Sequence, residues 1–272
     1  MNYFSPKSAA ERYSKGRPFF HPLIIGRIKE FLSLAEPLSS ALDVGCGTGL
    51  STVALKEIAQ NVVGVDASAE MIALAPREKG IKYSVAPAEN LPFEENEFDI
   101  ITLSQVFHWL DKDKFFAEAN RVLRPNGWLV AYDNYFSGRM TENTEFYRWY
   151  KEKYLEKYPI PPRGKIEFTP ENVSPYGFRL LKEEWVKNIV GFSLEGIVDY
   201  LVTQSNVIAA VEGGKEKIEE VKEWLTESIK SMFGIAEENF LFNAPIWYLN
   251  TLGNKSLNVK EKQQTGFFEI EN

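Results

Sequence analysis

The sequence predicts an α/β fold in which a mostly parallel sheet lies between two layers of helices. The length of 272 residues suits one such domain with an insertion. Residues 39–66 have the pattern of a strand, a glycine-rich loop, a helix and a second strand. Apolar runs at 81–86, 98–103 and 128–132 then alternate with helical patterns. That order is typical of strands joined by crossover helices in a parallel sheet.

The first strand–loop–helix unit carries the strongest functional signal. Its glycines occupy alternate positions and let the backbone take positive φ and approach a ligand closely: Gly45, Gly47 and Gly49. A helix is expected over 50–58 and a short buried strand over 62–66. Asp66 ends that strand, where a carboxylate can accept hydrogen bonds from ribose hydroxyls. The unit therefore predicts a nucleotide-like ligand at the carboxyl ends of the strands.

Asp43 lies two residues before Gly45, and its charge distinguishes between possible ligands of the loop. Its carboxylate is expected to face the glycine loop, where it would repel a pyrophosphate and attract an ammonium group. The G-x-G-x-G spacing also places Leu50 where the dinucleotide-binding fingerprint has its last glycine. The alternatives are a dinucleotide-binding unit and a strand–turn–helix that binds no ligand.

This motif resembles the first motif of the class I S-adenosylmethionine (SAM)-dependent methyltransferases, acidic-x-G-x-G-x-G. SAM offers an ammonium, a carboxylate and a ribose. The resemblance implies a Rossmann-like three-layer α/β/α sandwich with a mostly parallel seven-stranded sheet, an antiparallel last strand and, here, a helical cap insertion. The chain also resembles one group in this family, the small-molecule, trans-aconitate methyltransferase-like enzymes. This narrower resemblance rests on the first motif together with the Phe-His-Trp run at 107–109, the Pro-Asn-Gly turn at 125–127, an Arg-Pro leader and residues 200–205.

The resemblance implies an enzyme that transfers a methyl group from SAM to a small-molecule acceptor by in-line displacement. Small carboxylic acids, methylated on oxygen, are the leading acceptor class. Arginines that could pair with their carboxylates are Arg17, Arg139, Arg163 and Arg179. One alternative is a SAM-binding regulatory protein without catalysis. A second is a nicotinamide-dependent oxidoreductase.

The chain is expected to divide into five segments. They are an N-terminal lid segment with the first helix (1–36), a SAM-binding core (37–134), a cap over the active site (135–178), the remainder of the core with strands six and seven (179–252) and a polar tail (253–272). Tyrosines at helical spacing favour a helix over 142–158 inside the cap, where packing and a substrate wall are the two alternatives.

The expected cofactor contacts combine the motif with positions that the resemblance implies. They are Asp43, Gly45, Gly47, Gly49, Asp66, Ala67, Met71, Ala88, Glu89, Ser104 and Arg17. Many relatives carry an acidic residue where Pro87 stands, so Glu89 either replaces that carboxylate or only caps a helix. Met71 either flanks the adenine or packs in the core. Arg17 is implied near the cofactor carboxylate.

The acceptor is expected beyond the end of the fourth strand, because ligands of open α/β sheets bind at the carboxyl ends of strands. The predicted pocket residues are Tyr13, Phe107, Trp109, Tyr135 and Tyr147. His108 is the histidine placed to act as a general base, and lining the pocket or a structural role are its alternatives. A carboxylate acceptor needs no base, whereas a hydroxyl does.

Composition excludes several other functions. The net charge of −7 disfavours nucleic acid as a partner. The single cysteine, Cys46, excludes an internal disulfide and fits the cytoplasm. Two histidines and one cysteine cannot build a histidine or cysteine metal site, and we expect no metal. No apolar run is long enough to span a bilayer, and no secretory signal is present. We expect a cytoplasmic monomer or homodimer.

Overall fold

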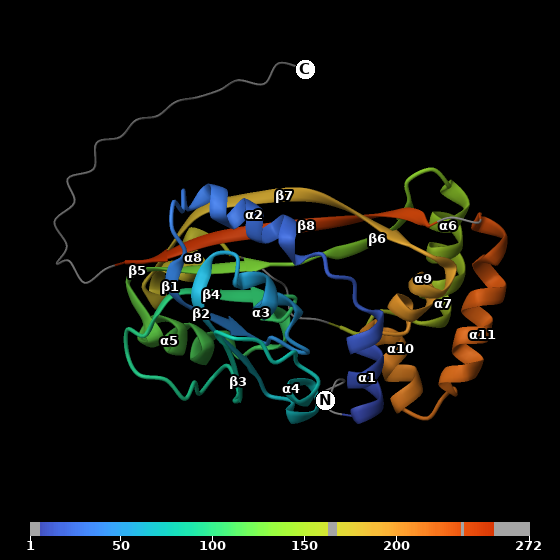
Figure 1. The fold of residues 1–272 in the computed structure, drawn as a ribbon. Helices are drawn as coiled ribbons and strands as arrows, with labels where there is room; N and C mark the ends of the chain where they lie inside the picture. The colour runs from blue at the N-terminus through green and yellow to red at the C-terminus, as the bar shows by residue number, and fades with distance from the viewer. Residues whose placement is uncertain (1–5, 163–167, 235–236, 253–272) are drawn as a thin grey trace, which may run out of the picture.

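The computed structural model describes residues 6–162, 168–234 and 237–252. Figure 1 shows a sheet flanked by helices and, at one end of its longest strands, a second group of helices. The sheet contains eight strands within the described residues, in the order β3-β2-β1-β4-β5-β8-β6, and β7 pairs with β8. This arrangement confirms the predicted α/β architecture.

Five parallel strands form the half of the sheet that carries the glycine loop. They are β1 (Leu38–Val44), β2 (Ala59–Asp66), β3 (Ile81–Val85), β4 (Phe98–Ser104) and β5 (Leu123–Tyr132). Because parallel strands end at the same edge of a sheet, the residues that follow β1, β2 and β4 meet there. The first strand–loop–helix unit and the end of the fourth strand therefore face one region.

The other half of the sheet is antiparallel. Strand β8 (Glu238–Thr251) runs antiparallel to β5, to β6 (Tyr135–Met140) and to β7 (Phe178–Phe192). The predicted antiparallel last strand is confirmed, and β6 is one strand more than the seven expected. The sequence of β6 does not show a regular strand pattern, because Gly138 has a φ of +69° and the pairing with β8 shifts register between Phe136 and Arg139.

Helices cover both faces of the parallel half. One face is covered by α2 (His21–Phe31) and α3 (Leu50–Leu55), and the other by α5 (Lys112–Val122), η1 (Phe107–Trp109), α8 (Pro170–Val173) and η3 (Ser174–Tyr176). Ile24, Ile25 and Leu55 are fully buried under the first pair, and Phe115 is fully buried on the opposite face. The apolar spacing that predicts these helices thus faces the sheet on both sides.

Side chains cap the starts of three helices. Ser68 Oγ accepts the backbone N–H of Met71 at 3.2 Å and begins α4 (Ala69–Ala73). Asp111 accepts the backbone N–H of Lys114 at the start of α5. Ser193 Oγ accepts the backbone N–H of Gly196 at the start of α9 (Leu194–Leu201). These bonds satisfy N–H groups that have no partner inside the helix.

The second group of helices, here called the helical lobe, has an apolar core of its own. It contains α6 (Thr144–Trp149), η2 (Tyr150–Tyr154), α7 (Leu155–Lys157), α9, α10 (Ser205–Glu212), α11 (Ile218–Ile229) and η4 (Lys230–Met232). Phe146, Tyr154, Leu201 and Leu225 are fully buried in it, together with Phe240 of β8. The cap segment predicted at 135–178 therefore packs with helices from 179–252 in one cluster.

Helix α1 (Lys7–Gly16) joins the two parts of the molecule. It packs against α9 of the helical lobe and against α4 of the core. Arg12 forms an ion pair with Glu212 of α10 at 2.6 Å. A Cβ on Gly16 would lie 2.2 Å from the carbonyl oxygen of Asp199, so only glycine permits this approach of α1 to α9.

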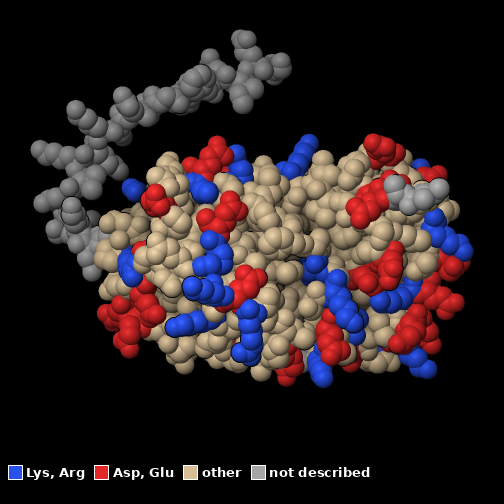
Figure 2. All heavy atoms as spheres, viewed as in Figure 1, with Lys and Arg blue, Asp and Glu red and all other residues tan. Residues whose placement is uncertain are grey.

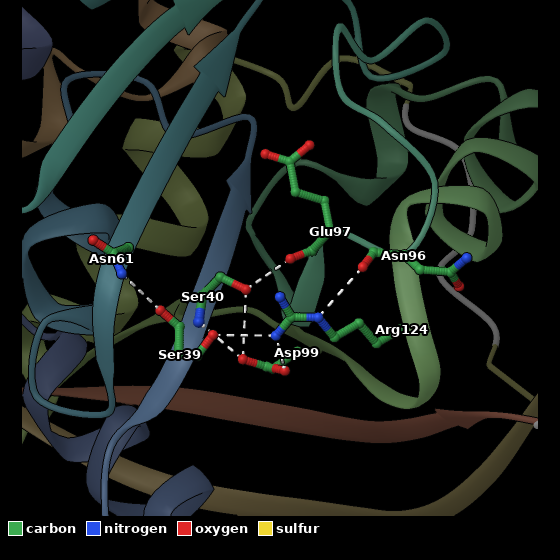
Figure 3. Close-up of polar contacts among 7 residues, drawn as sticks. All are labelled: Ser39, Ser40, Asn61, Asn96, Glu97, Asp99 and Arg124. Carbon is green, nitrogen blue, oxygen red and sulfur yellow. Dashed lines mark hydrogen bonds and ion pairs between the residues drawn. The ribbon is translucent and has the colours of Figure 1, made fainter.

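A polar network closes the opposite edge of the sheet, away from the glycine loop (Figure 3). Arg124 binds Asp99, which also accepts the backbone N–H of Ser40 at 2.9 Å. Burial raises the pKa of Asp99, but the hydrogen bonds from Arg124 and Ser40 outweigh it and lower the pKa below its usual value. The ionised carboxylate therefore stabilises the fold.

Asp99→Asn is expected to lower the free energy of unfolding at pH 7 by about 1 kcal/mol, since the pair is partly screened by solvent. A depressed carboxylate pKa contributes stability above the unfolded pKa, and this stability is lost as the pH falls through the folded value. Urea unfolding at pH 7 and pH 3 should show the difference shrinking at pH 3. Glu97→Gln is the control, because the side chain of Glu97 only accepts the N–H of Glu94. An equal effect of both variants would contradict this role.

The face of the molecule seen in Figure 2 carries charges of both signs. On the face seen in Figure 2, lysine and arginine side chains are interspersed with aspartate and glutamate. Within the described ranges, no helix has the length and apolar character needed to cross a bilayer. The same ranges contain no group of three or more His, Cys, Asp or Glu side chains placed to hold a metal ion.

Candidate functional site

The glycine loop folds as its sequence predicts. Gly45, Gly47 and Gly49 all have positive φ, at +70°, +54° and +83°. The N–H groups of Gly45 and Cys46 donate to the carbonyl oxygen of Val65 at 2.8 and 3.0 Å, which fixes the loop to β2. A Cβ on Gly45 would lie 2.4 Å from Val106 Cγ2. The loop can therefore sit against the residues that follow β4 only if glycine occupies this position.

The predicted orientation of Asp43 is wrong. Its side chain is fully buried and does not line the cavity beside the loop. The carboxylate accepts hydrogen bonds from Ser51 at 2.6 Å, Thr52 at 2.7 Å and Thr102 at 3.2 Å. Burial raises its pKa to about 6, although these three hydrogen bonds act in the opposite direction. Asp43 thus ties β1 to α3 and β4 and holds the loop from behind.

Asp66 lies at the ligand side of the loop. Its Oδ2 accepts the N–H of Gly47 and its Oδ1 accepts the N–H of Ser68, both at 2.8 Å. Burial raises the pKa of Asp66, and these backbone hydrogen bonds partly offset that effect. Each carboxylate oxygen keeps a further lone pair, so the group can still accept hydrogen bonds from a ligand.

A cavity of about 590 Å³ lies in front of the loop, here called the glycine-loop cavity. It brings together eight of the predicted cofactor residues: Gly45, Gly47, Asp66, Ala67, Met71, Ala88, Glu89 and Ser104. Tyr13, Ala86, Gln105, Val106, Trp109, Leu110 and Pro162 complete its lining. Glu89 also accepts the N–H of Asp111 at 2.9 Å, so the same carboxylate supports the start of α5 and faces the cavity.

Two other predicted cofactor residues lie outside this cavity. Gly49 precedes α3, and a Cβ there would meet the hydroxyl of Tyr83 at 2.5 Å. Arg17 lies at the end of α1 and lines the crevice behind the loop together with Thr48. Gly49 is therefore required by backbone packing, while Arg17 approaches from the side of the helical lobe.

A second cavity, of about 170 Å³, lies between the core and the helical lobe and is called here the interlobe cavity. Its lining contains Tyr13, Arg17, Gln105, His108, Trp109, Asp133, Asn134, Tyr135, Phe136, Tyr150, Tyr154, Ile160, Tyr200, Gln204, Ser205 and Asn206. Tyr13, Gln105 and Trp109 line both cavities. The two spaces therefore adjoin at these three side chains.

Arg17 and Gln105 connect the lobes at this junction. Arg17 Nη1 donates to Gln105 Oε1 at 3.4 Å, and Nη2 donates to the carbonyl oxygen of Thr203 at 3.1 Å. The guanidinium carbon also lies 4.5 Å from the ring centroid of Tyr13, within cation–π range. Gln105 has a φ of +57°, an uncommon conformation for a residue other than glycine that often marks a functional site.

The predicted acceptor residues fall into two groups. Trp109, Tyr135 and His108 line the interlobe cavity, as does Tyr13. Phe107 does not, because it is buried in the core with its ring centroid 4.4 Å from that of Phe168. Tyr147 lines neither cavity.

Tyr147 instead lies beneath a guanidinium. Arg139 is 4.3 Å from the centroid of its ring, so the predicted pocket role of Tyr147 is replaced by this stacking contact. Arg163, another candidate for binding carboxylates, lies outside the described residues.

Several lining residues were missed because they come from distant segments. Asp133 and Asn134 are buried at the junction of β5 and β6, and Gln204 precedes α10. Asn206 Nδ2 donates to the carbonyl oxygen of Tyr158 at 2.8 Å, which ties α10 to the end of α7. The polar run Gln-Ser-Asn at 204–206, between two apolar helices, is the sequence signal that could have indicated these residues.

Comparisons with known proteins agree on one family. Residues 42–131 match a family model described as a methyltransferase domain. A Dictyostelium discoideum protein named as a methyltransferase is 25% identical over 232 residues, which cover 84% of this chain and 87% of that protein. These matches identify a methyltransferase domain in the chain and support a class I SAM-dependent methyltransferase.

Two further relatives extend this result. A Saccharomyces cerevisiae protein named as a SAM-dependent methyltransferase is 25% identical to this chain. The matched region covers 58% of this chain and 57% of the yeast protein. The solved structure of an Anaeromyxobacter dehalogenans protein, described as a type II methyltransferase, superposes with a TM-score of 0.65 at 24% identity. It covers 87% of this chain and 98% of the other, so the two share the fold.

The glycine-loop cavity suits SAM, the cofactor of this family. When bound, SAM supplies an electrophilic methyl group carried on a sulfonium. Asp66 offers hydrogen-bond acceptors for a ribose, and the small side chains of Ala67, Ala86 and Ala88 leave space for a flat base. The positive-φ glycines permit close backbone approach of the methionine part.

Proposed function

We propose that the methyltransferase binds SAM in the glycine-loop cavity and methylates a small molecule held in the interlobe cavity. The observation that carries this proposal is the shared wall of the two cavities, formed by Tyr13, Gln105 and Trp109. In-line transfer requires the acceptor atom, the methyl carbon and the sulfur to lie on one line with the reacting atoms ~3 Å apart. Two adjoining spaces support this proposal, because they would allow the donor and the acceptor to face each other.

The roles proposed at the cofactor follow from the positions of the side chains. Asp66 holds the ribose hydroxyls, and Ala67, Met71 and Ala88 enclose the adenine. Arg17 lines both the crevice behind the loop and the interlobe cavity, so it lies where the methionine part of SAM and the acceptor would approach each other. Asp43 acts indirectly, by fixing the glycine loop through Ser51 and Thr52.

Asp66→Ala is expected to weaken SAM binding by at least about tenfold, because hydrogen bonds to a charged group contribute about 1.5–3 kcal/mol. Isothermal titration calorimetry with SAM measures this effect. Glu57→Ala, an exposed position at the end of α3, is the control. Unchanged affinity of Asp66→Ala would contradict the ribose assignment.

The leader is proposed to close the site. Tyr13 lies over the loop, since a Cβ on Gly47 would be 4.0 Å from its ring. Because α1 is held to the helical lobe by Arg12 and Glu212, the ring is kept between the two cavities. The segment thereby excludes water from the junction, and an aromatic face is suited to a sulfonium.

The acceptor class that we propose is a small carboxylic acid methylated on oxygen. The interlobe cavity is small, and Arg17 places a positive charge at its wall. If a carboxylate oxygen reacts, no proton has to be removed. If a hydroxyl of the acid reacts, His108 is the histidine in the lining that can accept its proton.

The test of this function is the fate of an isotopically labelled methyl group. The protein is incubated with labelled SAM and a cell extract, and the extract is then separated by size. We expect the label in the low-molecular-weight fraction, with Asp66→Ala as the inactive control. Label confined to protein or nucleic acid would contradict a small acceptor.

A further inference from the structure

Two residues that line the interlobe cavity each carry a buried hydrogen-bond donor without a partner in the described structure. Arg17 Nε and Gln204 Nε2 are both buried atoms without a hydrogen bond, and both residues line this cavity. A buried donor without a partner costs about 1–3 kcal/mol. Two of them in one small cavity indicate a place where a ligand supplies acceptor oxygens.

Arg17 contacts the residue before Gln204, and this part of the cavity wall is here called the Arg17–Gln204 corner. Arg17 Nη2 donates to the carbonyl oxygen of Thr203, the residue before Gln204. Gln204 immediately precedes α10, whose first turn contains no acidic residue and no side-chain cap from Gln204. The positive end of the α10 dipole therefore adds to the guanidinium at this corner.

The charges along the rest of the wall can be assigned as well. Asp133 is the acidic side chain among the described lining residues, and Arg17 is the side chain that carries a permanent positive charge. Arg17 Nη1 contacts Gln105, whose Nε2 donates to the carbonyl oxygen of Asn134 at 3.3 Å. Arg17 Nε has no hydrogen-bond partner, so it is the guanidinium nitrogen left to donate to a ligand.

We propose that Gln204, together with Arg17, anchors a carboxylate of the acceptor at this corner and so selects acids over neutral molecules. The inference rests on the proposed function and names the residue that sets its substrate class. The cavity volume of about 170 Å³ limits the acceptor to a compact molecule. A cavity of roughly 150 Å³ is enough for one benzene ring.

Gln204 is the residue to change, because Arg17 also lies beside the cofactor region and its substitution would alter SAM binding. The probes are benzoate, 4-hydroxybenzoate and hexanoate, each paired with its neutral amide. Binding is measured by calorimetry on the protein saturated with S-adenosylhomocysteine, so the readout does not depend on turnover. We expect at least one acid to bind at least about tenfold more tightly than its amide.

Gln204→Leu removes the donor at similar size and is expected to reduce this preference for the acid by about tenfold or more. Gln204→Glu places a like charge at the corner and should weaken the acid further while sparing the amide. Gln60→Leu, an exposed position on β2, is the matched control. SAM affinity should be unchanged in all three variants.

The proposal is overturned if no acid binds, if amides bind as tightly as acids, or if Gln204→Leu keeps the preference. A shift in SAM affinity in Gln204→Leu would assign the residue to the cofactor instead. Failure of the proposed function is distinguishable, since it would appear as absent methyl transfer into every small molecule while acids still bind.

Discussion

If a hydroxyl of the acid is the group that is methylated, His108→Ala is expected to lower the turnover number by about a hundredfold or more, the usual contribution of a positioned general base. His108 lines the interlobe cavity, and its ring centroid lies 4.8 Å from that of Trp109. SAM affinity should not change, because His108 does not line the glycine-loop cavity. The measurement is labelled-methyl transfer to the acceptor at saturating SAM.

Two readouts separate a base from a mere pocket wall. Added imidazole should restore part of the activity of His108→Ala, because it supplies the missing proton acceptor. His108→Phe is the companion variant, because it keeps a flat ring in the cavity without a proton acceptor. Full activity of His108→Ala would show that the reacting oxygen needs no base, as for a carboxylate.

Asp43→Asn is expected to remove a pH dependence of stability worth about 3 kcal/mol, since one pKa unit corresponds to about 1.36 kcal/mol. The pKa of the folded group is about 6, against 3.8 for the ordinary group. Stability from this site is therefore fully present below pH 3.8 and is lost as the pH rises through about 6. The asparagine side chain of the variant does not ionise in this pH range, so it makes no such contribution.

The measurement is urea unfolding of both proteins between pH 4 and pH 7.5. Relative to the wild type, Asp43→Asn should gain stability as the pH rises, and the gain should level off above pH 7. Glu57→Gln, which is exposed, should follow the wild type. A constant difference between the wild type and Asp43→Asn across this range would contradict the raised pKa.

The parts of the site that were predictable are those set by local sequence. Gly45 and Gly47 adopt positive φ because the chain must turn closely between β1 and α3, and a glycine pattern reports that directly. Asp66 follows a buried strand, and strand ends meet at one edge of a parallel sheet. Ser68 caps its helix through a neighbouring N–H, which is again a local contact.

Contacts between distant segments were not predictable in the same way. The direction of Asp43 depends on hydroxyls from α3 and β4, so its spacing from Gly45 alone suggested the wrong face. The helical lobe joins segments on either side of β7 around one apolar core, which no single periodic pattern shows. Gln204 reaches the interlobe cavity for the same reason.

The central claim is that SAM and the acceptor occupy adjoining cavities that meet at Tyr13, Gln105 and Trp109. A crystal structure of the complex with S-adenosylhomocysteine tests it most directly. The sulfur should lie at this junction, facing the interlobe cavity, with the ribose on Asp66. A sulfur that faces solvent, or a ribose placed away from Asp66, would contradict the account.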